Sequence, residues 1–514
     1  MPSLQTMSFK ISRWIASLSL IFATHAWALD CWDLESTAPG KTQKISQKKK
    51  AVVVISPFSS GSQAPEVFTR FGFEVITAAD HAELSAKQIQ GFKAFPHHLN
   101  LTNIKSLSER ADAIAKYAAA RGLDIVAVIP GAEHGTKLSM DLSVQLKNRW
   151  FPDMHANQFR DHFIDKEAWI RHLKKQGLSD FPSFSINSVK ALEQLAAREG
   201  FFQNDKWSSV ILKSPDSSGG NQVESHTSLE SLIASADKFF KTPNKYGHRN
   251  QKLLVQLDLG KDEAFIDGLV FTYKGKTHVF ITEIVDYDKY KDPVKKLNSY
   301  DASKFLSEKD ELSKVLTEFA SKALASADAS FAFFHIEVFP KKVNGKYDIK
   351  SIYSTDAAFR PVGAGYPAIA EFTQGESQFT LLAKLLSDPE KYLKELPREY
   401  SLKKPNYSWI GYSFVEGARL NPDLYSELAR VKDKVEREGG SIRWELDAAP
   451  GDPLPQGGEL ATKFGVVAVT HPDDAVAASL VYWVKNNTQW FAEGTGSHIP
   501  LGMENRRGKW EVEP

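Results

Sequence analysis

The stretch ILKSPDSSGGNQV, residues 211–223, places a single cation before a loop rich in serine and glycine. Lys213 ends a short apolar run, and four small residues follow soon after it: Ser217, Ser218, Gly219 and Gly220. One interpretation is an ordinary turn beside a solvated lysine, because Ser-Gly clusters usually mark loops. The other is a polyphosphate site, in which Lys213 supplies charge and exposed backbone N–H groups hold oxygen atoms. These residues alone do not decide between the two.

Two later predicted strands carry acids that could face a site. The first reads FAFFHIEVF, and its alternation puts His335, Glu337 and Phe339 on one face. An acid that shares a face with phenylalanines favours a lined site over the alternative of a surface carboxylate. Asp356 directly follows the second strand, YDIKSIYST, and its alternative role is to cap a turn.

Two further residues have both a chemical and an ordinary interpretation. Glu133, in PGAEHG, follows the predicted strand DIVAVIPG. Because ligands gather at the carboxyl ends of parallel strands, Glu133 is a candidate for substrate contact, and helix capping is the alternative. Lys166 lies at the start of an amphipathic helix, DKEAWIRHLKKQG, and taken alone it is an exposed helix lysine.

The elements that must position these residues fall into an α/β part and an α+β part. AVVVIS is short, continuous and β-branched, which is typical of a buried strand. FEVITA and DIVAVIPG follow it, with helical segments between, so we expect a parallel α/β domain over residues 51–155. Residues 156–385 mix helices with antiparallel strands, including a hairpin that turns at Lys274–Lys276. The tail, 386–514, carries two strands and a helix, which predicts a small C-terminal α+β subdomain.

Composition excludes some classes of function. The chain has 514 residues, of which 42% are hydrophobic and 25% charged, as is typical of a protein with a substantial core. Its net charge is +1, so the protein has no strong overall electrostatic field that would attract it to nucleic acid or acidic lipid. Cys31 is the only cysteine, which rules out an intrachain disulfide. Beyond the N-terminus, no stretch is long and apolar enough to predict a transmembrane helix.

Residues 1–28 have the three-part pattern of a secretory signal peptide. Lys10 and Arg13 precede the apolar stretch WIASLSLIFA, and Ala26 and Ala28 occupy the small positions before a cleavage site. The apolar stretch is too short to span a bilayer, and a buried N-terminal helix explains the charged flank less well. We therefore expect cleavage after Ala28 and export to the periplasm or out of the cell.

The order of the predicted pieces resembles the ATP-grasp superfamily, and within it the carboxylate–amine ligases that include amino acid ligases. In this family too, an α/β domain is followed by a lysine-bearing helix and then by a strand with a second lysine and a Gly-Ser loop. A hinge strand and two acidic strands come next, followed by an arginine and glycines. No single motif is specific, and the resemblance covers residues 51–385 and, more weakly, the tail. It implies a pre-ATP-grasp domain followed by a two-part ATP-grasp domain.

The resemblance also implies roles for individual residues. Lys166 and Lys213 match the two lysines that reach the phosphates, and Ser217–Gly220 match the loop that closes over them. Glu337 and Asp356 match the magnesium ligands. The adenine hinge is matched by Gln256, Leu257 and Asp258. Glu263 matches the acid that holds ribose. The donors for the tetrahedral intermediate are matched by Arg360, Gly363 and Gly365.

Two positions depart from the family pattern. Leu257 stands where a hinge glutamate is usual, which weakens the expectation that a side chain recognises adenine. The second metal strand in this family reads Glu-x-Asn-x-Arg, whereas this chain reads Asp356-Ala357-Ala358-Phe359-Arg360. Ala358 offers no ligand atom, so one magnesium site is either crippled or completed by water.

The function that the resemblance implies is an ATP-dependent ligase with ATP and Mg²⁺ as cofactors. Such an enzyme joins a small-molecule carboxylate, which can be an amino acid, to an amine through an acyl phosphate. The first alternative is an exported nucleotide-binding relative that has lost catalysis, which Ala358 and Leu257 favour. The second is a biotin-dependent carboxylase, which is weakened because no methionine is followed by lysine. A homodimer is left open.

Overall fold

The computed structural model describes the chain from residue 48 onward, with gaps. The described residues are 48–81, 89, 91–92, 95–146, 165–203, 205–215, 220–244, 247, 249–291, 298–327, 329–397, 399–457 and 462–493. They belong to one unit, Lys48–Pro514. The predicted signal peptide, Cys31 and residues 216–219 of the Ser-Gly loop lie outside the described part of the chain.

The N-terminal domain contains a four-stranded parallel sheet in the order β3-β2-β1-β4. Strand β1 is fully buried from Ala51 onward, as its continuous apolar sequence predicts. Helices α4 and α5 pack on one face of the sheet, and α2 and the later helix α11 pack on the other. The elements are β1 (Lys49–Ile55), α2 (Ala64–Arg70), β2 (Glu74–Ala79), β3 (His98–Asn100), α4 (Leu107–Ala119), β4 (Leu123–Pro130) and α5 (Thr136–Gln145).

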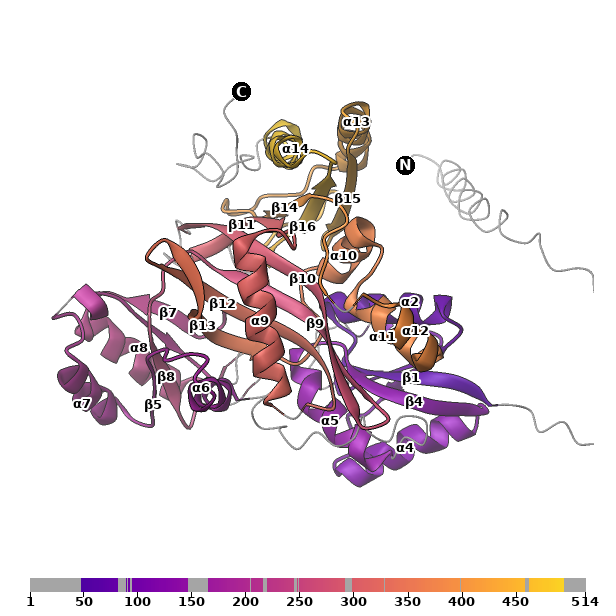
Figure 1. Cartoon of the computed structure of the whole chain (residues 1–514), viewed down its shortest axis with the longest axis horizontal. Coiled ribbons are helices and arrows are strands. Elements are labelled where there is room, and N and C mark those ends of the chain that lie inside the picture. The colour runs from indigo at the N-terminus through magenta and orange to yellow at the C-terminus, as the bar shows by residue number, and fades with distance from the viewer. Residues whose placement is uncertain are drawn as a thin grey trace, which may run out of the picture. The chain divides into compact units, whose positions relative to one another are not determined.

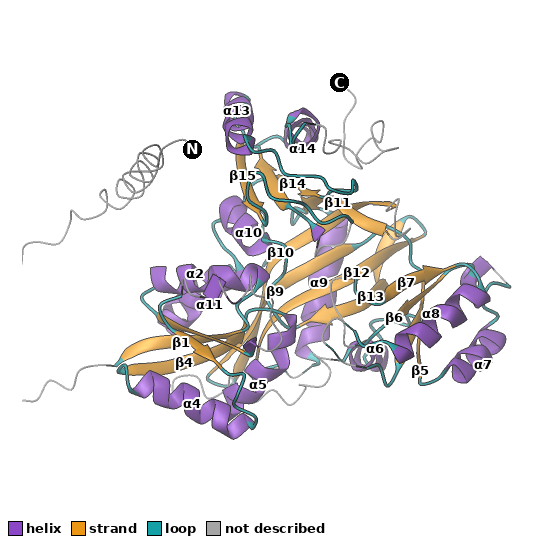
Figure 2. Cartoon of the chain, turned by 180° about the vertical axis from the view of Figure 1, so that it is seen from behind, coloured by secondary structure: helices purple, strands orange, loops and turns teal. Residues whose placement is uncertain are grey.

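A second, smaller sheet follows in the chain and has the antiparallel order β5-β8-β6-β7. Helices α7 and α8 bury their apolar faces against it in one cluster. Figure 2 shows these two helices side by side along this sheet. The elements are α6 (Lys166–Lys175), β5 (Ser183–Ile186), α7 (Val189–Glu199), β6 (Val210–Lys213), β7 (Val223–His226), α8 (Leu229–Lys241) and β8 (Leu253–Leu257).

The largest sheet has eight strands in the order β13-β12-β9-β10-β11-β14-β16-β15. Helix α9 crosses one face of its first strands (Figure 1), where Leu316 and Phe319 enter the core. The elements are β9 (Ala264–Tyr273), β10 (Lys276–Lys291), β11 (Asn298–Phe305), α9 (Glu311–Ala325), β12 (Phe331–Val343), β13 (Lys346–Ala358), α10 (Tyr366–Gln374), α11 (Gln378–Ser387), α12 (Pro389–Glu395), β14 (Asn406–Gly411), α13 (Leu424–Arg437), β15 (Ser441–Leu446), β16 (Gly465–Thr470) and α14 (Asp474–Asn487).

The predicted combination of a parallel α/β domain with an α+β region is confirmed. The hairpin between β9 and β10 turns at Lys274 and Gly275, and both have the positive φ that a two-residue hairpin turn requires. The C-terminal strands β14, β16 and β15 continue the large sheet, so the tail shares this sheet with the preceding region. The domain boundaries themselves stay predictions. In the described part of the chain, no helix has the length and apolarity to cross a membrane.

Candidate functional site

Strands β9, β12 and β13 bring the two predicted metal-binding acids together. In the antiparallel register of β12 and β13, Glu337 lies directly opposite Asp356, and His335 lies opposite Ala358. Directly opposed residues project their side chains from the same face of a sheet. The sequence therefore places two carboxylates side by side, although 19 positions separate them along the chain.

Helix α6 carries Lys166 to this pair of acids. The helix begins after Asp165, whose side chain accepts a hydrogen bond from the backbone N–H of Glu167. Its buried Trp169 donates to Ser354 Oγ on β13 at 2.9 Å, which fixes the helix against the large sheet. Lys166 is only 7% exposed, so it is not the exposed helix lysine of the ordinary interpretation.

Lys166 and Asp356 form a loose ion pair, with Lys166 Nζ 3.2 Å from Asp356 Oδ2. Burial alone would lower the pKa of Lys166, but Asp356 and Glu133 outweigh it and raise that pKa. Asp356 Oδ1 is buried and finds no hydrogen-bond partner among the described residues. The carboxylate therefore has one oxygen that no described residue uses.

Lys213, at the end of β6, reaches the same place from the smaller sheet. Its Nζ donates to the backbone oxygen of Thr355 at 2.8 Å, and the residue is 6% exposed. Burial lowers the pKa of Lys213 to about 8, although Asp356 acts in the opposite direction. A solvated lysine beside a turn would not be buried, so the structure rules out that interpretation. Of the loop that follows, only Gly220 is described among the predicted residues, with φ +79°.

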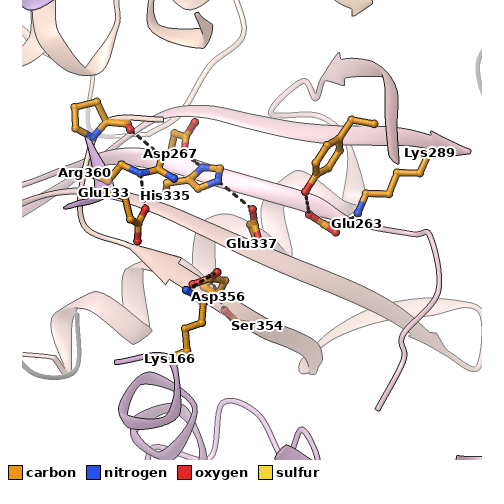
Figure 3. A network of polar contacts seen from close by, with 12 residues as sticks. Glu133, Lys166, Glu263, Asp267, Lys289, His335, Glu337, Ser354, Asp356 and Arg360 are labelled. Carbon is orange, nitrogen blue, oxygen red and sulfur yellow. Dashed lines mark hydrogen bonds and ion pairs between the residues drawn. The ribbon is translucent and has the colours of Figure 1, made fainter. Parts of the chain in front are cut away.

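Glu337 is held by the histidine that shares its strand face. His335 Nε2 lies 3.5 Å from Glu337 Oε1, and His335 Nδ1 lies 2.7 Å from Asp267 Oδ1 on β9 (Figure 3). Burial would lower the pKa of His335, but Asp267 raises it to about 10. Burial would likewise raise the pKa of Glu337, but His335 lowers it to about 2, with help from Lys289 and Lys213. Glu337 is therefore a carboxylate under ordinary conditions.

Arg360 joins the large sheet to the N-terminal domain. Its Nε donates to Glu133 Oε2 at 2.7 Å, and its Nη1 donates to the backbone oxygen of Pro361 at 2.9 Å. Burial would raise the pKa of Glu133, but Arg360 and Lys166 hold it below its usual value. Glu133 lies just after β4, at the carboxyl edge of the parallel sheet, as the sequence predicts.

The loops at the carboxyl edge of the parallel sheet meet the loop after Arg360. A side chain at Gly61 would lie 2.2 Å from the backbone oxygen of Gly131, so only glycine allows the loops after β1 and β4 to meet there. The backbone N–H of Gly365 donates to Ser60 Oγ at 3.2 Å, so this predicted donor is already in use. Gly363 comes near the same loop, since an added Cβ would lie 3.9 Å from Ser59 Oγ.

The predicted nucleotide hinge and ribose acid are largely buried. Gln256 donates to Ser183 Oγ at 3.0 Å and is 2% exposed. The oxygens of Asp258 accept bonds from nearby serine hydroxyls and from the backbone N–H of Gly260. Leu257 packs at the edge of the cluster under the smaller sheet and carries no polar group. The hinge side chains are therefore committed to the protein in this structure.

Glu263 forms an ion pair that the sequence did not reveal. Its carboxylate accepts from Lys289 Nζ, and its Oε1 also accepts from Tyr300 at 3.0 Å. Burial raises the pKa of Glu263, although Lys289 opposes this effect. Lys289 and Asp267 are the site residues that the sequence analysis missed. The only sequence signals for them are a lysine within DYDKYK and an aspartate within the apolar stretch AFIDGLVF.

The chemistry of these side chains fits a magnesium–nucleotide better than a bare metal ion. In the described part of the chain, no group of three acidic, histidine or cysteine side chains is placed to hold a metal. Mg²⁺ is commonly bound by only one or two carboxylates, with phosphates and waters completing its octahedron. Glu337 and Asp356 are a pair of carboxylates that could hold such an ion, and Lys166 and Lys213 beside them could meet phosphate oxygens.

Comparisons with known proteins agree with the fold. No protein-family model matches the chain. Dapdiamide A synthase from Enterobacter agglomerans is 20% identical over 446 residues, which are 86% of this chain and 96% of that protein. An L-amino acid ligase from Bacillus licheniformis superposes with a TM-score of 0.60 at 12% identity, over 85% of this chain and 98% of that one.

A second similar structure comes from another class of enzyme. It is the biotin carboxylase domain of the 2-oxoglutarate carboxylase from Hydrogenobacter thermophilus, solved as a dimer with MgADP, ADP and bicarbonate. Its TM-score is 0.56 at 12% identity, over 87% of this chain and 91% of that one. The chain thus has the fold of the ATP-grasp ligases, as predicted.

Proposed function

We propose that this protein is an ATP-dependent ligase that joins a carboxylate to an amine, with amino acids as the first substrates to test. The observation that carries the proposal is the opposed pair of Glu337 and Asp356, with Lys166 and Lys213 buried beside it. These cations and acids match the needs of a phosphoryl transfer, in which catalysis is mostly positioning and neutralisation of charge.

The residues of the chain would then act as follows. Lys166 and Lys213 hold phosphate oxygens of ATP, while Glu337 and Asp356 hold Mg²⁺. When bound, the ion neutralises charge on the phosphates. The substrate carboxylate attacks the γ-phosphorus, the bond to ADP breaks, and an acyl phosphate results. The amine then attacks the acyl carbon, phosphate leaves, and the amine nitrogen gives up a proton as the amide forms.

Arg360 would stabilise the negative charge that develops on the acyl oxygen during the second step. Glu133 and the carbonyl of Pro361 use two edges of its guanidinium, which holds the plane of this group in one orientation. Its Nη2 makes no hydrogen bond to any described residue. A donor fixed in this way needs little reorganisation at the moment of reaction.

The test is a screen for release of ADP and phosphate from ATP and Mg²⁺, over pairs of amino acids and other amines. We expect activity with at least one carboxylate–amine pair, with a condensed product detected by mass spectrometry. The Glu337→Gln variant should lose it, because one carboxylate is removed without a change in shape. Nucleotide binding without turnover for any pair would favour a non-catalytic relative, as Ala358 suggests. Turnover only with biotin and bicarbonate would favour a carboxylase.

We also propose that the protein is exported and that its mature chain begins near Leu29. The charged flank, the apolar stretch and the small residues at Ala26 and Ala28 support this. N-terminal sequencing of protein recovered from outside the cytoplasm checks it, and an intact Met1 there would count against it. Light scattering of the same sample would show whether it is a homodimer.

A further inference from the structure

His335 lies between two carboxylates that have different surroundings. Its Nδ1 contacts Asp267 Oδ1 at 2.7 Å, and its Nε2 lies 3.5 Å from Glu337 Oε1. Asp267 is completely buried, whereas the side chain of Glu337 is 28% exposed. Both ring nitrogens therefore face acids, one in the core and one in the candidate metal site.

A second buried acid, Glu283, lies next to Asp267. Asp267 on β9 pairs in register with Glu283 on β10, and both side chains are completely buried. Thr282 Oγ1 donates to Glu283 Oε2 at 3.0 Å. Burial and the neighbouring Asp267 raise the pKa of Glu283 well above its usual value, because two adjacent buried carboxyl groups disfavour a second negative charge. Asp267 therefore lies between Glu283 and His335, and its Oδ1 is the oxygen that contacts the imidazole.

The neighbouring strand leaves space for this histidine. The residue directly opposite His335 is Ala358, whose methyl group is the shortest side chain with a Cβ. The ring of Phe265 packs beside the imidazole, with 5.1 Å between ring centroids. The imidazole is thus held by a hydrogen bond on one side and by packing on the other, which restricts its rotation.

We propose that His335, anchored by Asp267, is a positioning residue that fixes the Glu337 carboxylate in the orientation needed to bind a magnesium–nucleotide. This inference rests on the proposed function, because it assumes that Glu337 meets the metal. Groups that orient a metal ligand without touching the metal commonly change its affinity about 10–100-fold when they are removed. A core histidine that is merely buried would not affect magnesium affinity in this way.

The test compares one variant of His335 and one variant of Asp267, which anchors it, with a matched control. His335→Gln keeps a polar side chain of similar reach but cannot contact both acids. Asp267→Asn leaves His335 in place and removes the charge that anchors it. The control is His172→Gln, because His172 is also buried and its ring lies within hydrogen-bond distance of the backbone oxygen of Ala323 and of Ser326 Oγ rather than beside a candidate metal ligand.

The first measurement is ADP affinity by calorimetry, with EDTA and across a magnesium titration. We expect His335→Gln to raise the magnesium concentration needed for half-maximal binding about tenfold or more. Asp267→Asn should raise it less, and adding it to His335→Gln should have little further effect. Binding in EDTA should stay within about twofold of the parent, and His172→Gln should match the parent throughout. An unchanged magnesium dependence in His335→Gln would overturn the positioning role, even if the variant melted earlier.

The second measurement separates this inference from the proposed function. Crystal structures of the parent and of both histidine variants give the position of the Glu337 carboxylate directly. We expect it to be displaced in His335→Gln and unmoved in His172→Gln. If the parent binds no magnesium–nucleotide at all, the proposed function fails, and the Glu337 position still decides whether His335 orients that carboxylate. An identical position in parent and His335→Gln would overturn the inference.

Discussion

The protein buries charge in two regions, and the two are satisfied to different degrees. In the first, Lys485 on α14 donates to both oxygens of Asp301 on β11, each at 2.8 Å. In the second, the candidate site, Lys166 lies 3.2 Å from Asp356, whose Oδ1 has no partner among the described residues. A pair that joins elements of a fold gains most when each partner satisfies the other. A buried carboxylate oxygen without a partner among the described residues is instead an acceptor that a ligand could use.

The largest expected effect comes from breaking the ion pair of Asp301 and Lys485. Asp301→Ala leaves the Lys485 charge buried without its partner, which should cost roughly 3–5 kcal/mol of unfolding free energy. Urea denaturation measures this loss. The control is Lys304→Ala, which breaks an ion pair to Asp474 between the same strand and helix but on the surface, and it should cost about 1 kcal/mol or less. Equal losses in the two variants would mean that burial does not distinguish these pairs.

The next largest effect concerns Lys213, a buried cation of the candidate site. Lys213→Ala should weaken ATP binding more than tenfold, because a charge-assisted hydrogen bond to phosphate contributes roughly 1.5–3 kcal/mol. Calorimetry with ATP and Mg²⁺ measures it, and Lys322→Ala on the outer face of α9 serves as the control. Parent-like affinity in Lys213→Ala would remove Lys213 from the phosphate site.

A smaller effect should follow from adding an oxygen to the site. Ala358→Asn restores the residue of the family pattern and offers a ligand for a second magnesium ion. We expect ATP turnover to reach half its maximum at a lower magnesium concentration than in the parent. Ala357→Asn, one position away and on the opposite face of β13, should give no such gain. A parent-like magnesium curve in Ala358→Asn would mean that no second ion binds beside this strand.

The smallest effect is a pH dependence that comes from the ion pair with Arg360. The folded-state pKa of Glu133 lies below its value in the unfolded chain, which is about 4.3. The unfolded chain therefore takes up this proton first, and the contribution to stability is present above about pH 4.3 and is lost as the pH falls through the folded-state pKa. The advantage of the parent over Glu133→Gln in unfolding free energy should then shrink between pH 7 and pH 3. An advantage independent of pH would contradict this, and Glu371→Gln, which breaks a surface pair with Arg70, is the control.

Local sequence predicted the elements well and the contacts between them poorly. AVVVIS and the hairpin at Lys274–Gly275 could be predicted because continuous β-branched residues and turn residues act over a few positions. The pairing of His335 with Asp267 joins residues 68 positions apart, and that of Arg360 with Glu133 joins residues 227 apart. Strand register and domain packing decide these contacts, and no local pattern encodes them.

The candidate acids could be predicted only in part for the same reason. Alternation placed His335 and Glu337 on one strand face, which the structure agrees with. It could not show that Glu263 would be enclosed by Lys289 and Tyr300, because these come from two other strands. Nor could it show that the oxygens of Asp258 would be taken up by serines of the smaller sheet.

The most direct test of the central claim follows an oxygen atom. The protein is supplied with ATP, Mg²⁺ and amino acids whose carboxyl oxygens carry ¹⁸O, and the phosphate released is analysed by ³¹P NMR. If an acyl phosphate forms and an amine attacks its carbon, one ¹⁸O passes from the carboxylate to the phosphate as the amide appears. We predict labelled phosphate in amounts equal to the amide. Phosphate that carries no label while ATP is consumed would contradict the account.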